Sequence, residues 1–509
     1  MRIAIITAGG AGMYCGSCLH DNTLAAALLA RGTEVQLIPT YTPIRTDEED
    51  VSLHRVFLGG INVYLQQKAR FWSRVPRAVR RVFDAPWILG KLGSLGLKTD
   101  PAKLGELTLS MLRGELGRQR DQLQQLATFL AEEARPDIVL LSNMLLAGLV
   151  EPLKRRWAGP VLCLLQGDDI FLEGLPEPYR SEARRLLQGR VREFDGFLIH
   201  SFYYRDFMAD YLGIPAHHTH IVPLGLNLIG YRCLQPSAQR SALSTQHSAL
   251  AESSLETHDS SLITHHSRFT VGYFARICPE KGLHVLVEAF DRLRGRDARC
   301  QLRVAGYLGA RDRAYFRGLC RQARRGGWNL EYAGALDRPG KIRFLESLDV
   351  LSVPTVYREP KGLYVLEALA SGVPVVQPQH GAFPELLEAT GGGLLVKPGD
   401  PESLADALDR LRRDPLARRQ FAAAGQATVR ERFNADVMAE STLAVLRQYV
   451  EPAAPAAKDT ATREQVDGRP ATAPQRGALA VSAPKPLSAQ PVEEARCDRI
   501  HAVGSRQTR

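Results

Sequence analysis

The sequence has no long hydrophobic run. A membrane-spanning helix needs about 18 or more consecutive apolar residues, and no such stretch occurs in the 509 residues. The first apolar segment, residues 2–7, is short and is soon followed by glycines, so we do not expect it to be a secretory signal. A protein that spans a membrane is therefore excluded.

Cysteine is also scarce. Eight cysteines are spread along the chain, which excludes a disulfide-stapled secreted scaffold and favours a reducing cytoplasm. Cys15 and Cys18 form the only close pair. No second Cys or His pair stands near it to complete a four-ligand zinc site, and we predict no metal. Two interpretations stay open for this pair: a redox role at the start of a helix, or packing and shaping of the backbone.

An excess of one charge is present but modest. Lys and Arg number 65 against 55 Asp and Glu, a net charge of +10. This surplus is compatible with nucleotide phosphates or anionic lipid as partners, but it does not indicate nucleic acid. The remaining composition, 45% hydrophobic and 24% charged, is that of an ordinary globular protein, and the length suggests two or three domains.

The first part of the chain is expected to be a parallel α/β domain over residues 1–230. It opens with a strand at 2–7, a glycine-rich turn, a helix at 17–31 closed by Gly32, and a strand at 34–38. Strand, glycine turn, helix and strand in this order are typical of such a domain. Further strands are predicted at 138–141, 161–165, 196–200 and 220–222.

A second α/β domain is expected over residues 269–433. The segment before it, 231–268, is rich in Ser, Gln, His and Thr and is predicted to be a disordered polar linker. A last helix is expected at 434–450 with Asn434 as its cap, followed by a disordered tail over 451–509. The predicted fold is therefore α/β, with two doubly wound, Rossmann-like domains. The strands expected in the second domain are 269–274, 301–305, 330–333, 350–353, 373–377 and 393–396.

The glycine loop of the first domain does not predict a dinucleotide site. Gly10 and Gly12 have no third glycine at the required spacing, where Cys15 stands. No acidic residue ends the next strand to hold a ribose, and no P-loop motif occurs anywhere. The loop is either a tight turn for helix packing or a turn that also lines a cleft at the carboxyl ends of the strands.

The second domain contains two groups with more specific chemistry. Arg276 and Lys281 stand beside the predicted helix start at Gly282, and two cations at a helix amino end suit a diphosphate. Glu359 and Glu367 follow on a loop and a helix, eight residues apart. Carboxylates accept several hydrogen bonds from sugar hydroxyls. The alternatives are solvated surface cations and a glutamate that satisfies buried polar groups.

These motifs resemble family-4 retaining glycosyltransferases of the GT-B fold. The strongest match is Glu359-x7-Glu367 within Glu-Pro-Lys-Gly-Leu-x3-Glu-Ala-Leu-Ala-x-Gly-Val-Pro-Val. The resemblance covers about residues 1–230 and 269–450. Other agreeing segments are Arg276 with Glu280-Lys281-Gly282, Leu302-Arg-Val-Ala-Gly306, Val222-Pro-Leu-Gly225, Gly381-Ala-Phe-Pro-Glu385 and Gly391 to Asp400.

The resemblance implies a cleft between the two domains, with a nucleotide-sugar donor held mostly by the second. It implies that Arg276 and Lys281 bind the diphosphate and stabilise it as it leaves. It implies that Glu359 contacts the donor sugar and that Glu367 binds the ribose hydroxyls. The amides of Gly362 and Leu363 would meet sugar or phosphate oxygens. Transfer would retain the anomeric configuration. The absence of an Asp-x-Asp motif fits a metal-independent enzyme whose donor is a substrate, with no further cofactor.

Two positions depart from the family pattern. Lys361 stands where the family has an aromatic residue, and Gln166 stands where it has a histidine. Glutamine cannot move a proton at neutral pH, so Asp168 or Asp169 is expected to take over base or sugar-binding work. The residues expected on the acceptor side are Gly10, Gly12, His20, Gln166 and Asp169.

Residues 68–91 combine basic and aromatic side chains, among them Arg70, Trp72 and Arg77. This composition fits a helix lying on an anionic membrane, or a helix packed on its own domain with a solvated basic face. The expected localisation is cytoplasmic, with peripheral membrane contact through this segment left open.

The function predicted from the sequence is transfer of a sugar from a UDP-, GDP- or ADP-sugar to a hydroxyl of a lipid, glycan or small molecule. Because Gln166 replaces a histidine, a non-catalytic relative that binds sugar nucleotides or glycans stays open. Another GT-B activity, such as nucleotide-sugar epimerisation, is the third alternative.

Overall fold

The computed structural model of the 509-residue chain describes residues 1–9, 15–58, 101–233 and 268–451. Residues Met1–Ala453 form one compact unit. Within the described ranges, no helix has the length and apolar composition needed to cross a bilayer. Several predictions lie outside the described residues: Gly10, Gly12, the basic segment 68–91, the linker beyond residue 233 and the tail from residue 452.

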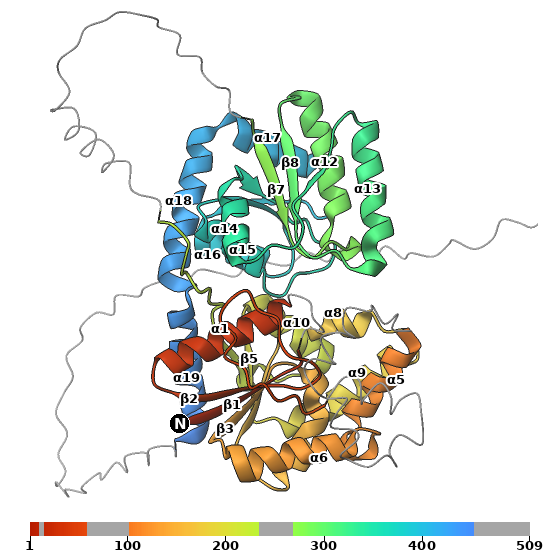
Figure 1. Ribbon diagram of the computed structural model, residues 1–509, viewed down its shortest axis with the longest axis vertical. Coiled ribbons are helices and arrows are strands. Elements are labelled where there is room, and N and C mark those ends of the chain that lie inside the picture. The colour runs from red at the N-terminus through yellow and green to blue at the C-terminus, as the bar shows by residue number, and fades with distance from the viewer. Residues whose placement is uncertain (10–14, 59–100, 234–267, 452–509) are drawn as a thin grey trace, which may run out of the picture. The chain divides into compact units, whose positions relative to one another are not determined.

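The N-terminal half contains a six-stranded sheet in the order β2-β1-β3-β4-β5-β6 (Figure 1). All its neighbouring strands are parallel. The strands are β1 (Arg2–Thr7), β2 (Glu34–Pro39), β3 (Ile138–Leu141), β4 (Val161–Leu164), β5 (Gly196–Ile199) and β6 (Thr219–Ile221). The central strands are buried on both faces, which explains their continuous apolar sequences.

Alternation along β1 divides the core between the two faces of this sheet. Ile3 and Ile5 pack on the face covered by α1 and α19, whereas Ala4 and Ile6 pack on the opposite face. The helices of this half are α1 (Gly16–Ala30), α5 (Pro101–Leu112), α6 (Arg120–Thr128), α7 (Val150–Lys154), α8 (Asp168–Glu173), α9 (Tyr179–Arg190) and α10 (Phe202–Leu212). Its short helical turns are Gly114–Leu116, Phe129–Ala134, Met144–Leu149, Val191–Glu193 and Ala216–His218.

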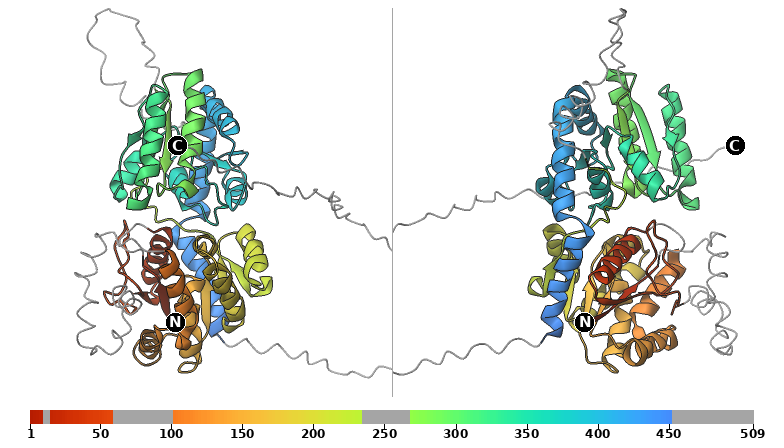
Figure 2. Two further views of the ribbon diagram at one scale, coloured as in Figure 1. Left: turned by 90° about the vertical axis from the view of Figure 1, so that its right-hand side faces the viewer. Right: turned by 60° about the vertical axis from the view of Figure 1, so that its left-hand side comes forward.

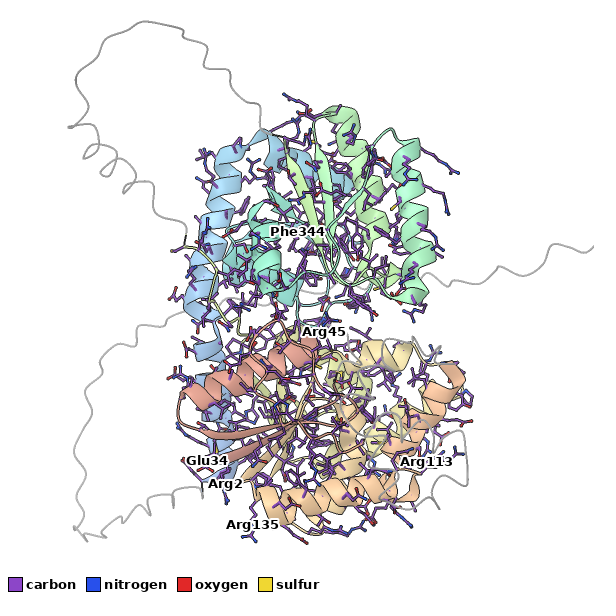
Figure 3. The ribbon with its side chains drawn as sticks, in the orientation of Figure 1. Arg2, Glu34, Arg45, Arg113, Arg135 and Phe344 are labelled. Carbon is purple, nitrogen blue, oxygen red and sulfur yellow. The ribbon has the colours of Figure 1, made fainter. Side chains whose placement is uncertain are left out.

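The C-terminal half contains a second six-stranded sheet, in the order β12-β11-β10-β7-β8-β9, with parallel neighbours throughout. Its strands are β7 (Thr270–Phe274), β8 (Gln301–Ala305), β9 (Glu331–Tyr332), β10 (Val350–Leu351), β11 (Val375–Pro378) and β12 (Gly393–Val396). Its helices are α12 (Leu283–Arg296), α13 (Arg313–Arg325), α14 (Arg338–Glu346), α15 (Leu363–Ala370), α16 (Phe383–Thr390), α17 (Pro401–Arg413) and α18 (Pro415–Arg432), with short turns at Pro279–Lys281 and Ala310–Asp312. Phe344 of α14, labelled in Figure 3, belongs to the core of this half.

The strand order places a topological switch point in the C-terminal sheet. The chain adds β8 and β9 on one side of β7, then returns to add β10, β11 and β12 on the other side. Ligands of doubly wound folds bind at the carboxyl ends of the strands that flank such a point. Arg276 follows β7 and Glu359 follows β10, so both predicted site residues lie on loops that leave this point.

The last helix, α19 (Ala435–Val450), returns to the N-terminal sheet. The chain passes directly from α18 to α19 (Figure 2). The side chain of Asn434 accepts a hydrogen bond from the amide of Val437 at 2.8 Å, as expected for a helix cap. The amide of Ala435 donates to Leu226 O at 3.0 Å, which fixes the crossing point. The predicted C-terminal crossover helix is therefore confirmed.

Several strand ends differ from the sequence prediction by one or two residues, such as β10, expected at 350–353 and observed at Val350–Leu351. Two further differences bear on the packing of the C-terminal half. The strand expected at 373–377 begins at Val375, because the amide of Val373 donates to Ala368 O at 2.9 Å and so still belongs to the end of α15. In addition, Leu224, Leu226 and Tyr231, expected at the end of the first domain and the start of the linker, pack in the C-terminal core.

We predict that Gly282→Ala destabilises the protein, because Gly282 precedes α12 with a φ of +72° and an added Cβ would lie 1.7 Å from Pro354 O. The left-handed conformation alone costs about 2 kcal/mol. Urea unfolding followed by circular dichroism should show at least that loss. Gly318→Ala is the matched control: it lies within α13 with no atom within 4 Å of an added Cβ, and it should stabilise by about 0.5–1 kcal/mol. Equal stability of the Gly282→Ala variant and the parent would contradict this reading.

Candidate active site

A buried ion pair stands at the switch point of the C-terminal sheet. Lys281, in the short turn before α12, places its Nζ 2.6 Å from Oε2 of Glu359, on the loop between β10 and α15. The hydroxyls of Tyr357 and Tyr364 donate to the same oxygen at 2.7 and 3.2 Å. The pKa of Glu359 lies below its ordinary value. Burial alone would raise it, but the charge of Lys281 and the hydrogen bonds from Lys281 and Tyr357 have the larger, opposite effect. Glu359 is therefore a held, ionised carboxylate.

Arg276 lies beside this pair on the loop after β7. Its backbone carbonyl accepts from the Tyr273 hydroxyl at 3.1 Å, and its Nε donates to Cys278 Sγ at 3.4 Å. The residue is exposed, and within the described part of the chain its guanidinium forms no ion pair. The loop thus holds the backbone of Arg276 while its charge stays available to an anion.

Glu367, on α15, belongs to a second charged cluster. Lys341 of α14 contacts Glu367 Oε1 at 2.7 Å and Asp47 Oδ2 at 2.5 Å, and all three side chains are buried. Two carboxylates therefore share one ammonium group. Burial raises the pKa of Glu367 despite the opposing charge of Lys341. The same carboxylates keep the pKa of Lys341 above its ordinary value although burial opposes them.

The loop after β2 that carries Asp47 makes a second ion pair with α14. Glu48 and Arg338 are 3.0 Å apart and largely buried. Arg338 also donates to Asn227 O at 2.6 Å. Arg45 of the same loop is labelled in Figure 3 and lies on the side of the N-terminal half that meets the C-terminal half. Together these contacts join the halves on the side of Glu367.

The two positions that depart from the family pattern contact each other. Lys361 Nζ donates to Gln166 Oε1 at 2.9 Å and to Ser17 Oγ at 3.2 Å. Gln166 Nε2 in turn donates to Asp21 Oδ1 at 2.8 Å, and the hydroxyl of Thr7 donates to Asp21 Oδ2 at 2.7 Å. Burial lowers the pKa of Lys361. The Lys361 side chain thus crosses from the Glu359 loop to the N-terminal sheet.

His20, predicted on the acceptor side, is buried on α1 beside this chain of hydrogen bonds. Its Nδ1 lies 3.4 Å from Asp21 Oδ1, and its ring centroid lies 4.7 Å from that of His200. Burial lowers the pKa of both histidines. A lowered pKa favours the neutral form of both rings near neutral pH, in which each ring has one hydrogen-bond donor and one acceptor.

Asp168 and Asp169 begin α8, directly after Gln166 and Gly167. The two oxygens of Asp168 accept the amides of Met144 at 3.0 Å and Gln166 at 3.2 Å. Asp169 Oδ1 accepts the Tyr204 hydroxyl at 2.6 Å. Burial raises the pKa of Asp168 to about 7. In this arrangement Asp168 holds the backbone that presents Gln166, and Asp169 is anchored on α10.

Gly362 and Leu363 form the start of α15. Gly362 has a φ of +78°, which favours glycine because other residues rarely adopt it. Leu363 begins the helix, and the first amides of a helix have no partner within it. On the other side of the loop, the amide of Ala382 donates to Glu359 O at 2.8 Å. The loop from Glu359 to Leu363 is thus fixed at both ends.

A further contact between the halves involves the carboxylate of Glu385 on α16. It accepts the amides of Phe202, at 2.9 Å, and Tyr203. These amides belong to the amino end of α10, where the helix dipole favours a negative charge. The segment Gly381 to Glu385 therefore carries a contact with the N-terminal half as well as supporting Glu359.

A cavity of about 660 Å³ lies elsewhere, at the amino ends of β7, β8 and β9. Its lining includes Arg268, Arg299, Trp328 and Glu331. Because ligands of doubly wound sheets bind at the carboxyl ends of the strands, we do not assign the site to this cavity. No group of three or more His, Cys, Asp or Glu suited to a metal occurs among the described residues.

Sequence reasoning did not find every residue of these clusters. Asp47 and Glu48 lie in an acidic run after the second strand, and that run was their only signal. Lys341 gave none, because its partners Asp47 and Glu367 are distant in the sequence. The two tyrosines on Glu359 lie two and five residues from it, but no motif marked them. Arg276, Lys281, Glu359 and Glu367 lie on neighbouring loops and helices of the C-terminal half, as the motif spacing required.

Part of the C-terminal half is similar to a known family. Residues 256–428 match the family described as glycosyl transferases group 1. A phosphatidyl-myo-inositol mannosyltransferase of Mycobacterium leprae is 32% identical over 169 residues, which are 33% of this chain and 43% of that protein. A GDP-mannose-dependent monoacylated alpha-(1-6)-phosphatidylinositol monomannoside mannosyltransferase of Corynebacterium glutamicum is 29% identical over 179 residues, 34% of this chain and 45% of the relative. The matches thus span less than half the length of these relatives.

Solved structures extend the likeness to most of the chain. HepE of Anabaena, in complex with UDP, is 17% identical, with a TM-score of 0.56 over 88% of this chain and 100% of that one. Sucrose-phosphate synthase of Thermosynechococcus elongatus is 17% identical, with a TM-score of 0.61 over 88% of this chain and 99% of that one. These likenesses show the fold. The GT-B fold expected from the sequence is confirmed.

We predict that Asp168 makes stability depend on pH. Its pKa rises from 3.8 to about 7 on folding, so its stabilising contribution is complete below pH 3.8 and is lost as pH rises through about 7. Between about pH 5 and pH 8, the protein should lose about 3 kcal/mol more unfolding free energy than the Asp168→Asn variant.

The slope of unfolding free energy against pH is the readout, because the asparagine amide also perturbs the two backbone contacts at every pH. Asp210→Asn is the control: Asp210 is exposed on α10, and its replacement should leave the slope unchanged. Parallel curves for the parent and the Asp168→Asn variant would show that the carboxyl does not titrate in this range.

Proposed function

We propose that this chain, whose residues 256–428 match the family of glycosyl transferases group 1, transfers a sugar from a nucleotide-diphosphate sugar to a hydroxyl acceptor with retention of configuration. The observation that carries the proposal is the Lys281–Glu359 pair at the switch point of the C-terminal sheet, with the exposed Arg276 beside it. A diphosphate needs cations, a sugar needs hydrogen-bond acceptors, and this point offers both.

In the proposed mechanism, Arg276 and Lys281 neutralise the charge that develops on the departing diphosphate. Lys281 is already held by Glu359 at 2.6 Å, and the amino end of α12 follows it directly. Preorganised positive groups lower the barrier because they need no rearrangement as the bond breaks. The proposal assigns this charge relief to side chains rather than to a divalent cation.

Glu359 is proposed to orient the donor sugar. One of its oxygens is occupied by Lys281, Tyr357 and Tyr364, which leaves the other for sugar hydroxyls. The amides of Gly362 and Leu363, at the start of α15, are proposed to bind sugar or phosphate oxygens. The acceptor hydroxyl then attacks from the face that the diphosphate leaves, which retains the configuration.

Glu367 is proposed to bind the ribose hydroxyls of the donor. Lys341 occupies its Oε1, and Oε2 is left to accept from the ribose. Because Asp47 shares the same ammonium group, ribose binding and the contact between the halves involve one charge cluster. This arrangement would link occupation of the donor site to the position of the loop after β2.

On the acceptor side, we propose that His20, Gln166 and Asp169 line the acceptor position and that Asp168 sets the backbone of Gln166. The named relatives act on phosphatidylinositol derivatives, which supports a lipid-linked acceptor. One relative's name includes GDP-mannose, while the HepE structure contains UDP, so both GDP- and UDP-sugars belong in the donor test. A lipid-linked acceptor would place the reaction at the cytoplasmic face of a membrane.

We predict that Lys281→Met and Arg276→Met each lower transfer by about 100-fold or more, because each removes a charge that stabilises the leaving group. The measurement is sugar transfer with UDP-, GDP- and ADP-sugars, together with donor binding by calorimetry. Lys397→Met is the matched control, since the Lys397 side chain is 78% exposed and pairs with Asp400; this variant should transfer normally. Undiminished transfer by both site variants would remove the proposed diphosphate site.

We predict that Glu359→Gln lowers transfer strongly and also destabilises the protein, because it leaves Lys281 partly buried without its carboxylate. Breaking a buried pair costs about 3–5 kcal/mol, and the partial exposure of Lys281 puts the expected loss at or below the lower end of that range. The double variant Lys281→Met/Glu359→Gln should regain stability but not transfer. Full activity of a folded Glu359→Gln variant would contradict the role given to this residue.

The same donor panel separates the alternative functions. If the protein binds nucleotide sugars without catalysing transfer, it would bind a donor but yield no product with any lipid, glycan or small-molecule acceptor. An epimerase would convert the donor sugar without any acceptor, and chromatography of the recovered nucleotide sugar would show it. If the protein bound none of the UDP-, GDP- or ADP-sugars, the proposed function and both alternatives would be excluded.

A further inference from the structure

Cys15 and Cys18 lie at the first turn of α1, within the N-terminal half. Cys15 directly precedes the helix, and its carbonyl accepts the amide of Leu19 at 2.9 Å. Cys18 is 2% exposed and packs in the core between α1 and the sheet, whereas Cys15 is half-buried at its edge. Both thiols are free. Cysteines at this spacing on a helix amino end are close enough to form a disulfide when oxidised.

The segment between the two cysteines contacts the Glu359 loop. Ser17 Oγ accepts a hydrogen bond from Lys361 Nζ at 3.2 Å, and the second acceptor of that ammonium group is the amide oxygen of Gln166 at 2.9 Å. Both hydrogen-bond partners are neutral. A buried cation is costly without a counter-charge, so Lys361 depends on negative groups a little farther away.

The sulfur of Cys15 is one of these negative groups. The pKa of Cys15 is lowered to about 5, mainly because the Cys18 thiol donates a hydrogen bond to its sulfur. Burial raises this pKa. The backbone amides of Cys18 and Ser17 and the charge of Lys361 lower it further. For Lys361, burial lowers the pKa, and Cys15 comes first among the charges that raise it again. A thiolate at position 15 and an ammonium at position 361 therefore stabilise each other.

We propose that Cys15 and Cys18 are a reversible dithiol–disulfide pair whose oxidation removes the negative sulfur facing Lys361 and thereby weakens the donor site. The proposal rests on the function proposed above for that site. It adds a modification site to the chain and names its chemistry: a small-molecule disulfide as oxidant and a dithiol as reductant.

The reaction follows ordinary thiol–disulfide exchange. The Cys15 thiolate attacks one sulfur of glutathione disulfide, forms a mixed disulfide and releases one glutathione thiolate. Cys18 then gives its proton to solvent and attacks the Cys15 sulfur, which expels the second glutathione. Two protein thiols are oxidised and one glutathione disulfide is reduced to two thiols. A dithiol such as dithiothreitol reverses both steps.

Other described cysteines lack these features. Cys163 lies inside β4, and burial raises its pKa. Cys320, half-buried on α13, also has its pKa raised by burial. None of the other described cysteines has a cysteine three residues away, so a disulfide at this spacing should form only at the start of α1, whereas the exposed Cys233 can take up glutathione only as a mixed disulfide.

The experiment uses the full-length protein in glutathione buffers of graded reduction potential, followed by rapid acid quenching, alkylation and peptide mass measurement. We expect a disulfide linking Cys15 and Cys18 to appear with a single midpoint and to vanish with dithiothreitol. Absence of the linked peptide at every potential overturns the proposal, and this measurement requires no variant.

Variants test the electrostatic part. In Cys18→Ala, oxidation should stop at the mixed disulfide on Cys15, and the pH midpoint of Cys15 alkylation by iodoacetamide should rise above that of the parent, because the hydrogen bond that lowers the Cys15 pKa is lost. Lys361→Met should also raise this midpoint. Cys320→Ser, the control, should form the Cys15–Cys18 disulfide with the parent's midpoint. An alkylation midpoint that neither Cys18→Ala nor Lys361→Met moves overturns the proposed coupling.

Donor binding in the two redox states distinguishes this proposal from the function on which it rests. We expect the oxidised protein to bind its preferred nucleotide sugar at least about threefold more weakly than the reduced protein. Equal affinity in both states overturns the coupling even if transfer is active. Weaker binding on oxidation by a protein that transfers no sugar supports the redox pair and removes the transferase function.

Discussion

The structure depends on one constraint: buried ammonium and guanidinium groups of the C-terminal half are satisfied by acceptors from the N-terminal half. Lys341 reaches Asp47, Arg338 reaches Glu48, and Lys361 reaches Gln166. A buried cation without a partner costs several kcal/mol, so these contacts restrict how far the halves separate without rehydrating the charges. The Lys281–Glu359 pair, held within the C-terminal half, needs no such partner. The Lys281–Glu359 pair, proposed to bind the donor, is thus independent of the contacts between the halves.

This division has a chemical consequence for the proposed function. The groups proposed for the diphosphate and sugar come from two loops of one sheet, the loop after β7 and the loop after β10, so under the proposed function the C-terminal half can hold a donor by itself. The groups around Gln166 and Asp21 come from the other sheet, and their hydrogen bond to the Glu359 loop is the one from Lys361 to Gln166; Ser201 of the same half also donates to Pro360 O at 3.5 Å. Gln166 stands where the family has a histidine, and Lys361 stands where it has an aromatic residue. Together they form a hydrogen bond from a cationic donor to a neutral acceptor, which joins the two halves.

Much of the fold could be predicted from the sequence, because strands buried on both faces of a parallel sheet are continuous apolar runs, as in β3 and β8. The Glu359 and Glu367 spacing alone left a structural role open, and it was the resemblance of the surrounding motif to family-4 glycosyltransferases that predicted a site there. Asp47, Lys341 and the Lys361–Gln166 contact could not be predicted, since each depends on a pairing between residues far apart in the sequence. The start of β11 was missed by two residues because a helix-end hydrogen bond competes with the strand. The domain bounds, the site roles and the basic segment 68–91 stay predictions.

The crossover helix has a consequence for how the chain matures. Ile5, Ile138 and Leu162 of the first sheet are covered partly by α1 and partly by Leu443 and Leu446 of α19. During synthesis, the strands that carry Ile5, Ile138 and Leu162 leave the ribosome roughly 280 to 440 residues before Leu443 and Leu446 of α19, so one apolar face stays incompletely covered until α19 has been made. Domains usually fold in order as they emerge. Here the earliest sheet to be made is among the last to be completed, and exposed apolar surface of that kind is what molecular chaperones bind.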